Sequence, residues 1–206
     1  MSGPHEGSCV SAMAEHHVAA LAETLTAALT ADPFYQAITP NGEQRAALIA
    51  YFALAVREAL TAGEVQIIAD GAGVAIWTAP TGSPGAATAA ADKHDALAGL
   101  LAGTGWDAYE SISAFSHRHV AQHVPGAAWY LSILGVDPAR QGGGLGGRLL
   151  QPTLARLDAQ GLSCYLETFN PRSLAFYARH GFDPVATEVE PVTGARYWLL
   201  LRRQHP

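Results

Sequence analysis

The chain has 206 residues, of which 49% are hydrophobic and 15% are charged. This composition supplies enough apolar material for a packed core and excludes disordered, collagen-like and disulfide-scaffold chains. Chains of this length usually close around one core, so we expect a single domain over residues 1–206. Twelve basic residues against eighteen acidic ones give a formal net charge of −6, and Lys93 is the one lysine. Because there is no basic cluster, we expect no nucleic-acid partner.

The N-terminal residues, the longest uncharged stretch and the cysteines predict the compartment. Residues 1–12 have no periodic apolar pattern and are expected to be disordered, and they do not read as a signal peptide. The longest stretch without Asp, Glu, Lys or Arg, residues 71–91, contains two prolines and many small residues, so no membrane span is expected. Cys9 and Cys164 form no motif and fit a reducing environment. We therefore expect a cytoplasmic protein without a membrane partner.

Apolar residues at steps of three and four, followed by shorter apolar runs, predict the elements of the first half. Asp32-Pro33 is expected to stop the first helix, and Asp70-Gly71-Ala72-Gly73 is typical of a hairpin turn. In chain order we expect helices at about 14–29 and 43–61, strands at 64–69 and 74–78, an irregular stretch at 79–91, and helical segments near 92–102 and 107–123.

The second half alternates strands and helices. Ala128–Val136 is apolar almost throughout, which is typical of a central strand buried on both faces. Asn170-Pro171 opens a short helix with an N-cap and a first-turn proline, and Gly181 ends it. We also expect a helix at about 144–160 and strands at 163–168, 182–188 and 196–202. The whole chain therefore predicts an α/β fold.

A glycine-rich turn follows the central strand. Between Val136 and Arg148 the chain carries five glycines and then an apolar-faced helix. Glycines let successive backbone N–H groups converge, and a helix N-terminus adds positive potential, so this pattern favours an anion such as a pyrophosphate. A flexible loop without a ligand is the alternative, but such a loop needs neither a buried strand before it nor an apolar helix after it.

Three phosphate-binding templates compete for this turn. A P-loop fails, because Gly147 is followed by Arg148 rather than by Lys. The dinucleotide pattern G-x-G-x-x-G is present at Gly142, Gly144 and Gly147, although four residues separate it from the strand end. A dinucleotide-binding oxidoreductase is therefore the weaker alternative.

The third template, Q/R-x-x-G-x-G/A, binds acyl-CoA and is matched by Gln141, Gly144 and Gly146. Together with the downstream segment Phe176-Tyr177-x-x-x-Gly181-Phe182, it resembles the GNAT (GCN5-related) N-acetyltransferase family. The resemblance covers about residues 64–202 and is closest to puromycin N-acetyltransferase-like members. It implies the GNAT fold, a mixed, mostly antiparallel central sheet with splayed central strands flanked by helices, and a CoA-binding core at about 128–182.

The resemblance also implies an activity, acetyl transfer from acetyl-CoA to the primary amine of a small molecule by direct attack in a ternary complex. A non-catalytic acyl-CoA-binding regulatory module is the alternative from another class. The implied pantetheine contacts lie on the strand at Leu134, Gly135 and Val136, where a backbone N–H would polarise the thioester carbonyl. The remaining expected cofactor contacts are Gln141, Gly142, Gly143, Gly144, Leu145, Gly146, Gly147, Arg148, Asn170, Ser173 and Tyr177. The family often has Asn where this chain has Ser173, and Asn170 reads better as a helix cap.

Two residues are predicted to move protons. Tyr177 occupies the family's tyrosine position, and a phenol can protonate a departing thiolate without first being ionised. Glu167, at the end of a strand beside the expected cofactor slot, is the predicted base, whereas Glu110 is the weaker candidate. Acceptor contacts are expected from Phe34, Tyr35, Trp77 and Tyr109.

Metal binding is not expected. His119 and His123 have helical spacing, and His117 lies near them, but no Glu between the pair and no nearby cysteine completes a zinc pattern. The expected partner is a small-molecule amine, and the chain is expected to be a monomer or a homodimer.

Overall fold

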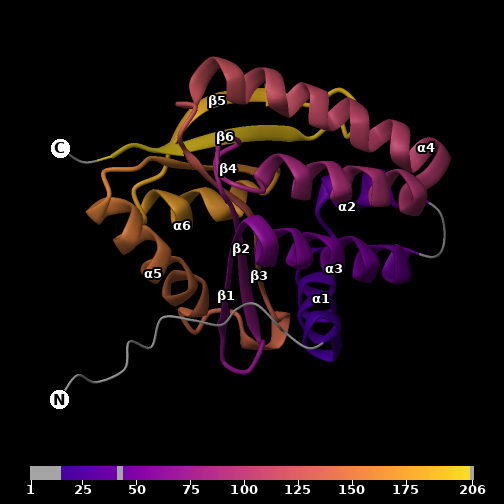
Figure 1. Ribbon diagram of the computed structural model, residues 1–206, viewed down its shortest axis with the longest axis horizontal. Helices are drawn as coiled ribbons and strands as arrows, with labels where there is room; N and C mark the ends of the chain where they lie inside the picture. Colours follow the sequence, from indigo (N-terminus) through magenta and orange to yellow (C-terminus); the bar gives the residue numbers. More distant parts are fainter. Residues whose placement is uncertain (1–14, 41–43, 205–206) are drawn as a thin grey trace.

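The computed structural model describes residues 15–40 and 44–204. The expected disorder of residues 1–12 and the expected helix start at Glu43 lie outside these residues. The helices are α1 (Glu15–Leu29), α2 (Pro33–Ile38), α3 (Gln44–Ala62), α4 (Ala86–His123), α5 (Leu145–Ala159) and α6 (Leu174–Ala178), and the strands are β1 (Gly63–Ile68), β2 (Gly73–Thr78), β3 (Trp129–Val136), β4 (Cys164–Thr168), β5 (Asp183–Val189) and β6 (Arg196–Arg202) (Figure 1). No helix in this part of the chain has the length and apolarity needed to cross a membrane.

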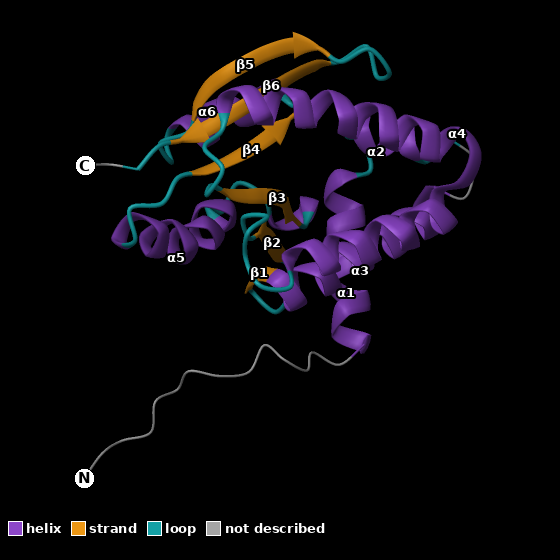
Figure 2. Ribbon diagram, turned by 45° about the horizontal axis from the view of Figure 1, so that its top comes forward, coloured by secondary structure: helices purple, strands orange, loops and turns teal. Residues whose placement is uncertain are grey.

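The strands form one sheet in the order β1-β2-β3-β4-β6-β5. Neighbouring strands are antiparallel except β3 and β4, which are parallel and pair only at Trp129↔Cys164 and Tyr130↔Tyr165. Beyond these two pairs the strands part, and Figure 2 shows β1–β3 and β4–β6 as two separate halves. The expected fold, a mostly antiparallel sheet with splayed central strands and flanking helices, is confirmed.

A bulge in β3 lies where the strands begin to part. Ile76 pairs with Ile133, but the next residue, Trp77, pairs with Leu131, so Ser132 has no opposite residue on β2. The Ser132 hydroxyl donates to the Ile76 carbonyl at 3.1 Å. Because a bulge bends its strand and increases the local twist, it turns the rest of β3 away from β4.

The core lies on both faces of β2. Val74 and Ile76 face α1 and α3, whereas Ala75 and Trp77 face α5. All four side chains are fully buried. This explains why β2 is apolar at every position rather than alternating. A smaller cluster around Phe115 joins α4 to β6.

The helices differ from expectation in two places. The first helix ends at Leu29 as expected, but Asp32-Pro33 then begins a helix that was not predicted, with Asp32 as the N-cap of α2 and Pro33 as its first residue. Proline fits this position because its missing N–H would have no partner within the helix. Residues 79–91 are not irregular throughout, since α4 begins at Ala86. The expected gap after residue 102 shrinks to a kink at Ala102 and Gly103, and Figure 1 shows the two arms of α4 at an angle.

The contact between α4 and α2 depends on a glycine. A Cβ added at Gly105 would lie 2.4 Å from the backbone carbonyl oxygen of Ile38, so Gly105→Ala must push α2 away from α4. We expect the substitution to lower the free energy of unfolding by about 1–3 kcal/mol, measured by urea denaturation. Gly99→Ala is the matched control, because Gly99 lies in the same helix with nothing within 4 Å. Alanine at position 99 should raise the free energy of unfolding by about 0.5–1 kcal/mol. Equal effects of the two variants would contradict the close contact.

Candidate active site

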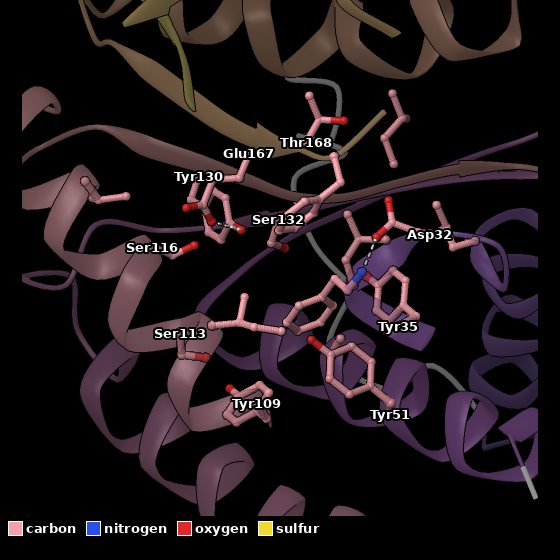
Figure 3. A pocket seen from close by; sticks show the side chains of 18 of the residues that line it. Asp32, Tyr35, Tyr51, Tyr109, Ser113, Ser116, Tyr130, Ser132, Glu167 and Thr168 are labelled. Atoms are coloured by element: carbon pink, nitrogen blue, oxygen red, sulfur yellow. Dashed lines mark hydrogen bonds between the residues drawn. The ribbon is translucent and has the colours of Figure 1, made fainter. Parts of the chain in front are cut away.

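A cavity of about 300 Å³ opens beside the parted strands. Its walls come from the end of α1, from Asp32 and α2, from α3 and α4, from β3 and β4, and from α6 (Figure 3). Of the residues predicted for the site, the cavity wall contains Phe34, Tyr35, Tyr109, Leu134, Glu167 and Tyr177. Segments that are far apart in the sequence therefore meet at the point where β3 and β4 separate.

The glycine turn after β3 presents unpaired backbone amides. Gly142 and Gly144 have positive φ angles of 81° and 76°, and no atom lies within 4 Å of a Cβ added at either position. No described residue accepts a hydrogen bond from the amides of residues 142–147. Exposed Arg148 adds a positive charge in the first turn of α5 and forms no ion pair with a described residue. This arrangement fits a pyrophosphate.

Side chains at the start of the turn hold it in shape. The Gln141 amide nitrogen donates to the carbonyl of Val136, the last residue of β3, at 3.0 Å. Asp137 accepts from the amide of Ala139 at 2.9 Å, and its own amide donates to the Ala72 carbonyl in the β1–β2 turn. Gln141, predicted to contact the cofactor, therefore also closes the loop.

Other glycines of the predicted set are explained by packing. A Cβ at Gly135 would lie 2.7 Å from Leu25 of α1, so glycine lets α1 lie directly on β3. Gly146 and Gly147 of α5 pack against the rings of Phe176 and His180. A Cβ added at Gly146 would lie 3.3 Å from the Phe176 ring, and one added at Gly147 would lie 3.2 Å from the His180 ring. These positions bring the elements around the turn together.

Tyr177 lies on α6 with its ring at edge-to-face angles to Phe176 and Phe182. Its side chain lines the cavity, and no described residue hydrogen-bonds its hydroxyl. Burial raises the pKa of this phenol above its ordinary value, and the charge of Asp32 raises it further. Tyr177 is thus a protonated, unengaged donor at neutral pH, as a general acid must be.

Glu167 of β4 is engaged through both of its oxygens. The hydroxyl of Tyr130 on β3 donates to Oε2 at 2.8 Å, and that of Tyr197 on β6 donates to Oε1 at 2.5 Å. Burial and the Glu167 charge hold the pKa of both tyrosines well above their ordinary value. These bonds join three strands at the base of the split.

Asp32 is a charged residue of the cavity wall that the sequence did not predict. Its Oδ1 accepts the Phe34 amide at 2.9 Å as the N-cap of α2. The same side chain lines the cavity, and burial raises its pKa to about 6 even though the Phe34 hydrogen bond lowers it. The dipeptide Asp32-Pro33 signals a helix boundary, and no sequence signal distinguishes a cap from a cavity carboxylate.

Asn170 and Ser173 form a local network before α6. Asn170 caps the turn by accepting the Arg172 amide at 3.0 Å. The Ser173 hydroxyl donates to the Asn170 carbonyl at 2.7 Å and lies 3.2 Å from the Thr168 hydroxyl. The capping role of Asn170 agrees with the sequence reading, and cofactor contact by either residue stays a prediction.

Trp77 is the one predicted acceptor contact that the structure removes from the site. Its side chain is fully buried among the residues that pack against α5 and is not in the cavity wall. The expectation was wrong because β2 is covered on both faces, so no face of the strand is left for a ligand.

The other candidates raised by the sequence lie mostly elsewhere. Glu110 pairs with His94 at 3.1 Å on an exposed part of α4. His119 packs against Phe115 and Tyr197, whereas His117 lines the cavity. Within residues 15–40 and 44–204, no three His, Cys, Asp or Glu side chains are grouped so that they could hold a metal ion.

Comparison with known proteins identifies the class of enzyme to which this chain belongs. Residues 73–182, more than half of the chain, match the acetyltransferase (GNAT) family. The chain belongs to this family and is an acyltransferase enzyme. Its family generally uses acetyl-CoA as co-substrate.

Relatives of known name share parts of the sequence or the whole fold. The mycothiol acetyltransferase of Kineococcus radiotolerans is 41% identical over 70 residues, which cover 32% of this chain and 22% of that protein. The mycothiol acetyltransferase of Beutenbergia cavernae is 42% identical over 71 residues, which cover 32% of this chain and 24% of that protein. The matched stretch thus spans under a quarter of these curated relatives. None of these relatives is a puromycin N-acetyltransferase, so that finer resemblance stays a prediction.

Solved structures show the fold over nearly the full length. A crystal structure of histone acetyltransferase HPA2 and related acetyltransferase from Corynebacterium glutamicum has a TM-score of 0.68 at 20% identity, covering 94% of each chain. The polyamine N-acetyltransferase of Drosophila melanogaster has a TM-score of 0.61 at 13% identity, covering 93% of this chain and 97% of its own. At such identities the likeness is one of fold.

Because burial raises the pKa of Asp32 from 3.8 to about 6, the folded chain holds this proton more tightly than the unfolded chain does. The ionised carboxylate therefore costs stability above pH 6, and this cost disappears as the pH falls below about 4. Asp32→Asn keeps the cap and removes the charge. Solvent screens a partly exposed charge, so we expect a gain of about 1 kcal/mol at pH 8, or about 2–4 °C in Tm. Thermal unfolding should show a smaller gain at pH 5, and an equal gain at both pH values would contradict the raised pKa.

Proposed function

We propose that the enzyme transfers an acetyl group from acetyl-CoA to the primary amine of a small cationic molecule, by direct attack in a ternary complex. The observation that carries the proposal is the position of one cavity at the split between β3 and β4, with the unpaired amides of the glycine turn after β3 and the unengaged Tyr177 hydroxyl on α6. An acyl donor held along β3 would place its thioester between these parts.

The residues present fit coenzyme A. Amides of residues 142–147 and the Arg148 guanidinium would hold the diphosphate, and the edge of β3 from Leu131 to Val136 would bind an extended arm as a neighbouring strand does. Acetyl-CoA supplies an activated acyl carbon. The protein contributes backbone donors on β3 that polarise the carbonyl, and it contributes the shape that aligns the acceptor.

The lining of the cavity favours a cationic acceptor. Glu167 and Asp32 contribute carboxylates, and six tyrosines contribute ring faces and edges. The single lysine in the wall, Lys93, is paired with Glu58 at 2.5 Å, so its charge is offset. Carboxylates and aromatic rings both attract an ammonium group.

An alkyl ammonium has a pKa of about 10, so it must lose a proton before its nitrogen can attack. The departing thiolate must gain one. Tyr177 is suited to the second task, because its phenol is protonated and free to donate. A carboxylate of the cavity is suited to the first, with Glu167 predicted from the sequence.

A panel of amines tests the substrate class. Polyamines, agmatine, amino sugars and aminonucleosides are each incubated with acetyl-CoA, and release of free thiol is followed. We expect turnover with at least one cationic amine and none with alcohols of the same size. Thermal-shift titration with acetyl-CoA and with NAD is the companion measurement, because only a bound ligand raises Tm. Stabilisation by NAD alone, or thiol release with no amine in the panel, would overturn the proposal.

Tyr177→Phe removes only the phenolic oxygen. We expect kcat to fall by about 10²–10⁴-fold, because the thiolate then leaves without a proton donor. The Tm shift caused by acetyl-CoA should stay unchanged, since the ring still packs on Phe182. Tyr51→Phe is the matched comparison in the same cavity, and its kcat should fall by less than tenfold. Similar losses in both variants would show that Tyr177 has no special role.

A further inference from the structure

The cavity wall contains two carboxylates, Glu167 and Asp32, which differ in the hydrogen bonds that their oxygens already accept. Both oxygens of Glu167 accept hydrogen bonds from phenols, those of Tyr130 and Tyr197. A new donor from a molecule in the cavity would have to displace one of these hydrogen bonds, because each oxygen already has a partner. Glu167 is therefore occupied in holding three strands together.

Asp32 has a free oxygen. Its Oδ1 accepts the Phe34 amide, and no group among the described residues donates to Oδ2. No Lys, Arg or His of the described chain forms an ion pair with it. Figure 3 shows its carboxylate entering the cavity from a different side than Glu167. One lone pair of Asp32 is thus available to a molecule in the cavity.

Asp32 is also the carboxylate whose charge affects the Tyr177 phenol. Both side chains line the cavity, and the charge of Asp32 contributes to the raised pKa of the Tyr177 phenol, whereas no contribution comes from Glu167. Acetyl transfer to an amine needs both a proton acceptor and a proton donor, and this cavity has Asp32 and Tyr177 in its wall.

We infer that Asp32, rather than Glu167, binds the ammonium group of the acceptor and accepts its proton. This inference rests on the proposed function. One proton passes from the ammonium to Oδ2 of Asp32 and on to solvent. The freed lone pair forms the C–N bond to the acyl carbon as the C–S bond breaks. Tyr177 gives its proton to sulfur, and the second proton lost by nitrogen restores Tyr177. The products are the N-acetyl amine, the free thiol and one proton.

Other ionisable groups face the cavity from every neighbouring element. They are Tyr35 of α2, Tyr51 of α3, Lys93, Tyr109 and His117 of α4, Tyr130 of β3, Tyr165 and Glu167 of β4, and Tyr177 of α6. Burial holds the pKa of each of these tyrosines above its ordinary value, so none loses a proton near pH 6. His117 is exposed on α4, and His117→Gln is the control that removes this side chain from the cavity wall.

The test compares kcat/KM between pH 5 and 9 for the wild type, Asp32→Asn, Glu167→Gln and His117→Gln, with an amine that the panel identifies. Asp32→Asn retains the N-cap of α2, so folding is preserved. We expect it to lower kcat/KM by about 10²-fold or more and to abolish the fall in activity below pH 6. Glu167→Gln and His117→Gln should keep that fall. Asp183→Asn, an exposed aspartate on β5, should behave as the wild type.

A weakly basic acceptor provides a readout that a structural defect would not change. A fluorinated analogue of the same amine arrives neutral at pH 8 and needs no proton acceptor before attack. The deficit of Asp32→Asn should therefore shrink to less than about tenfold with this analogue. An equal deficit with both amines, or loss of the acid limb in Glu167→Gln instead, overturns the assignment. An active wild type with unaffected Asp32→Asn overturns only this inference, whereas an inactive wild type overturns the proposed function as well.

Discussion

The parting of β3 from β4 is the constraint on which the rest of this structure depends. Two parallel strands that pair over only two residues leave backbone donors and acceptors unpaired along one edge of β3, in the middle of the sheet. Such groups are costly when they are buried without partners. The bulge at Ser132 explains why the separation occurs there, and the full pairing of β3 with β2 keeps the free edge rigid. The fold thus provides a strand edge to a ligand without risking the aggregation that a free edge at the rim of a sheet invites.

Side-chain hydrogen bonds connect the strands and helices on both sides of the split. The hydrogen bonds from Tyr130 and Tyr197 to Glu167 tie β3, β4 and β6 together at the base, where Tyr130 also stacks on Tyr165 at 4.7 Å. At the end where β3 and β4 pair, Arg202 of β6 lies opposite Cys164 and donates to both oxygens of Asp158 on α5 and to the His180 carbonyl. These contacts fix α5 and the segment after α6 to the second half of the sheet. The helix that follows the glycine turn is thus anchored to the sheet near its last turn.

Much of this architecture could be predicted, because the spacing of apolar residues along the chain indicates which face of a helix or strand is buried. Each strand lies within one residue of its expected ends, and α1, α3 and α5 follow their apolar stripes. The glycine turn and the Tyr177 segment could be found because the chemistry of each depends on residue type and local spacing. Helix α2 was missed because six residues are too few to show a period. Trp77 was misplaced because an aromatic residue in a strand does not reveal whether the opposite face of the sheet is covered.

Asp32 has one role that the sequence predicts and another that it does not. Its local role is visible in the sequence, since Asp before Pro starts a helix, and that role explains the residue completely until the cavity is known. Ser, Thr or Asn would cap α2 as well as Asp does. Only Asp places a charge in a partly enclosed cavity, where burial penalises the ionised form. Capping therefore accounts for a short polar side chain at this position but not for its charge. A carboxylate that lowers stability when ionised, and that leaves one oxygen free beside Tyr177, is accounted for by a cationic ligand that neutralises it.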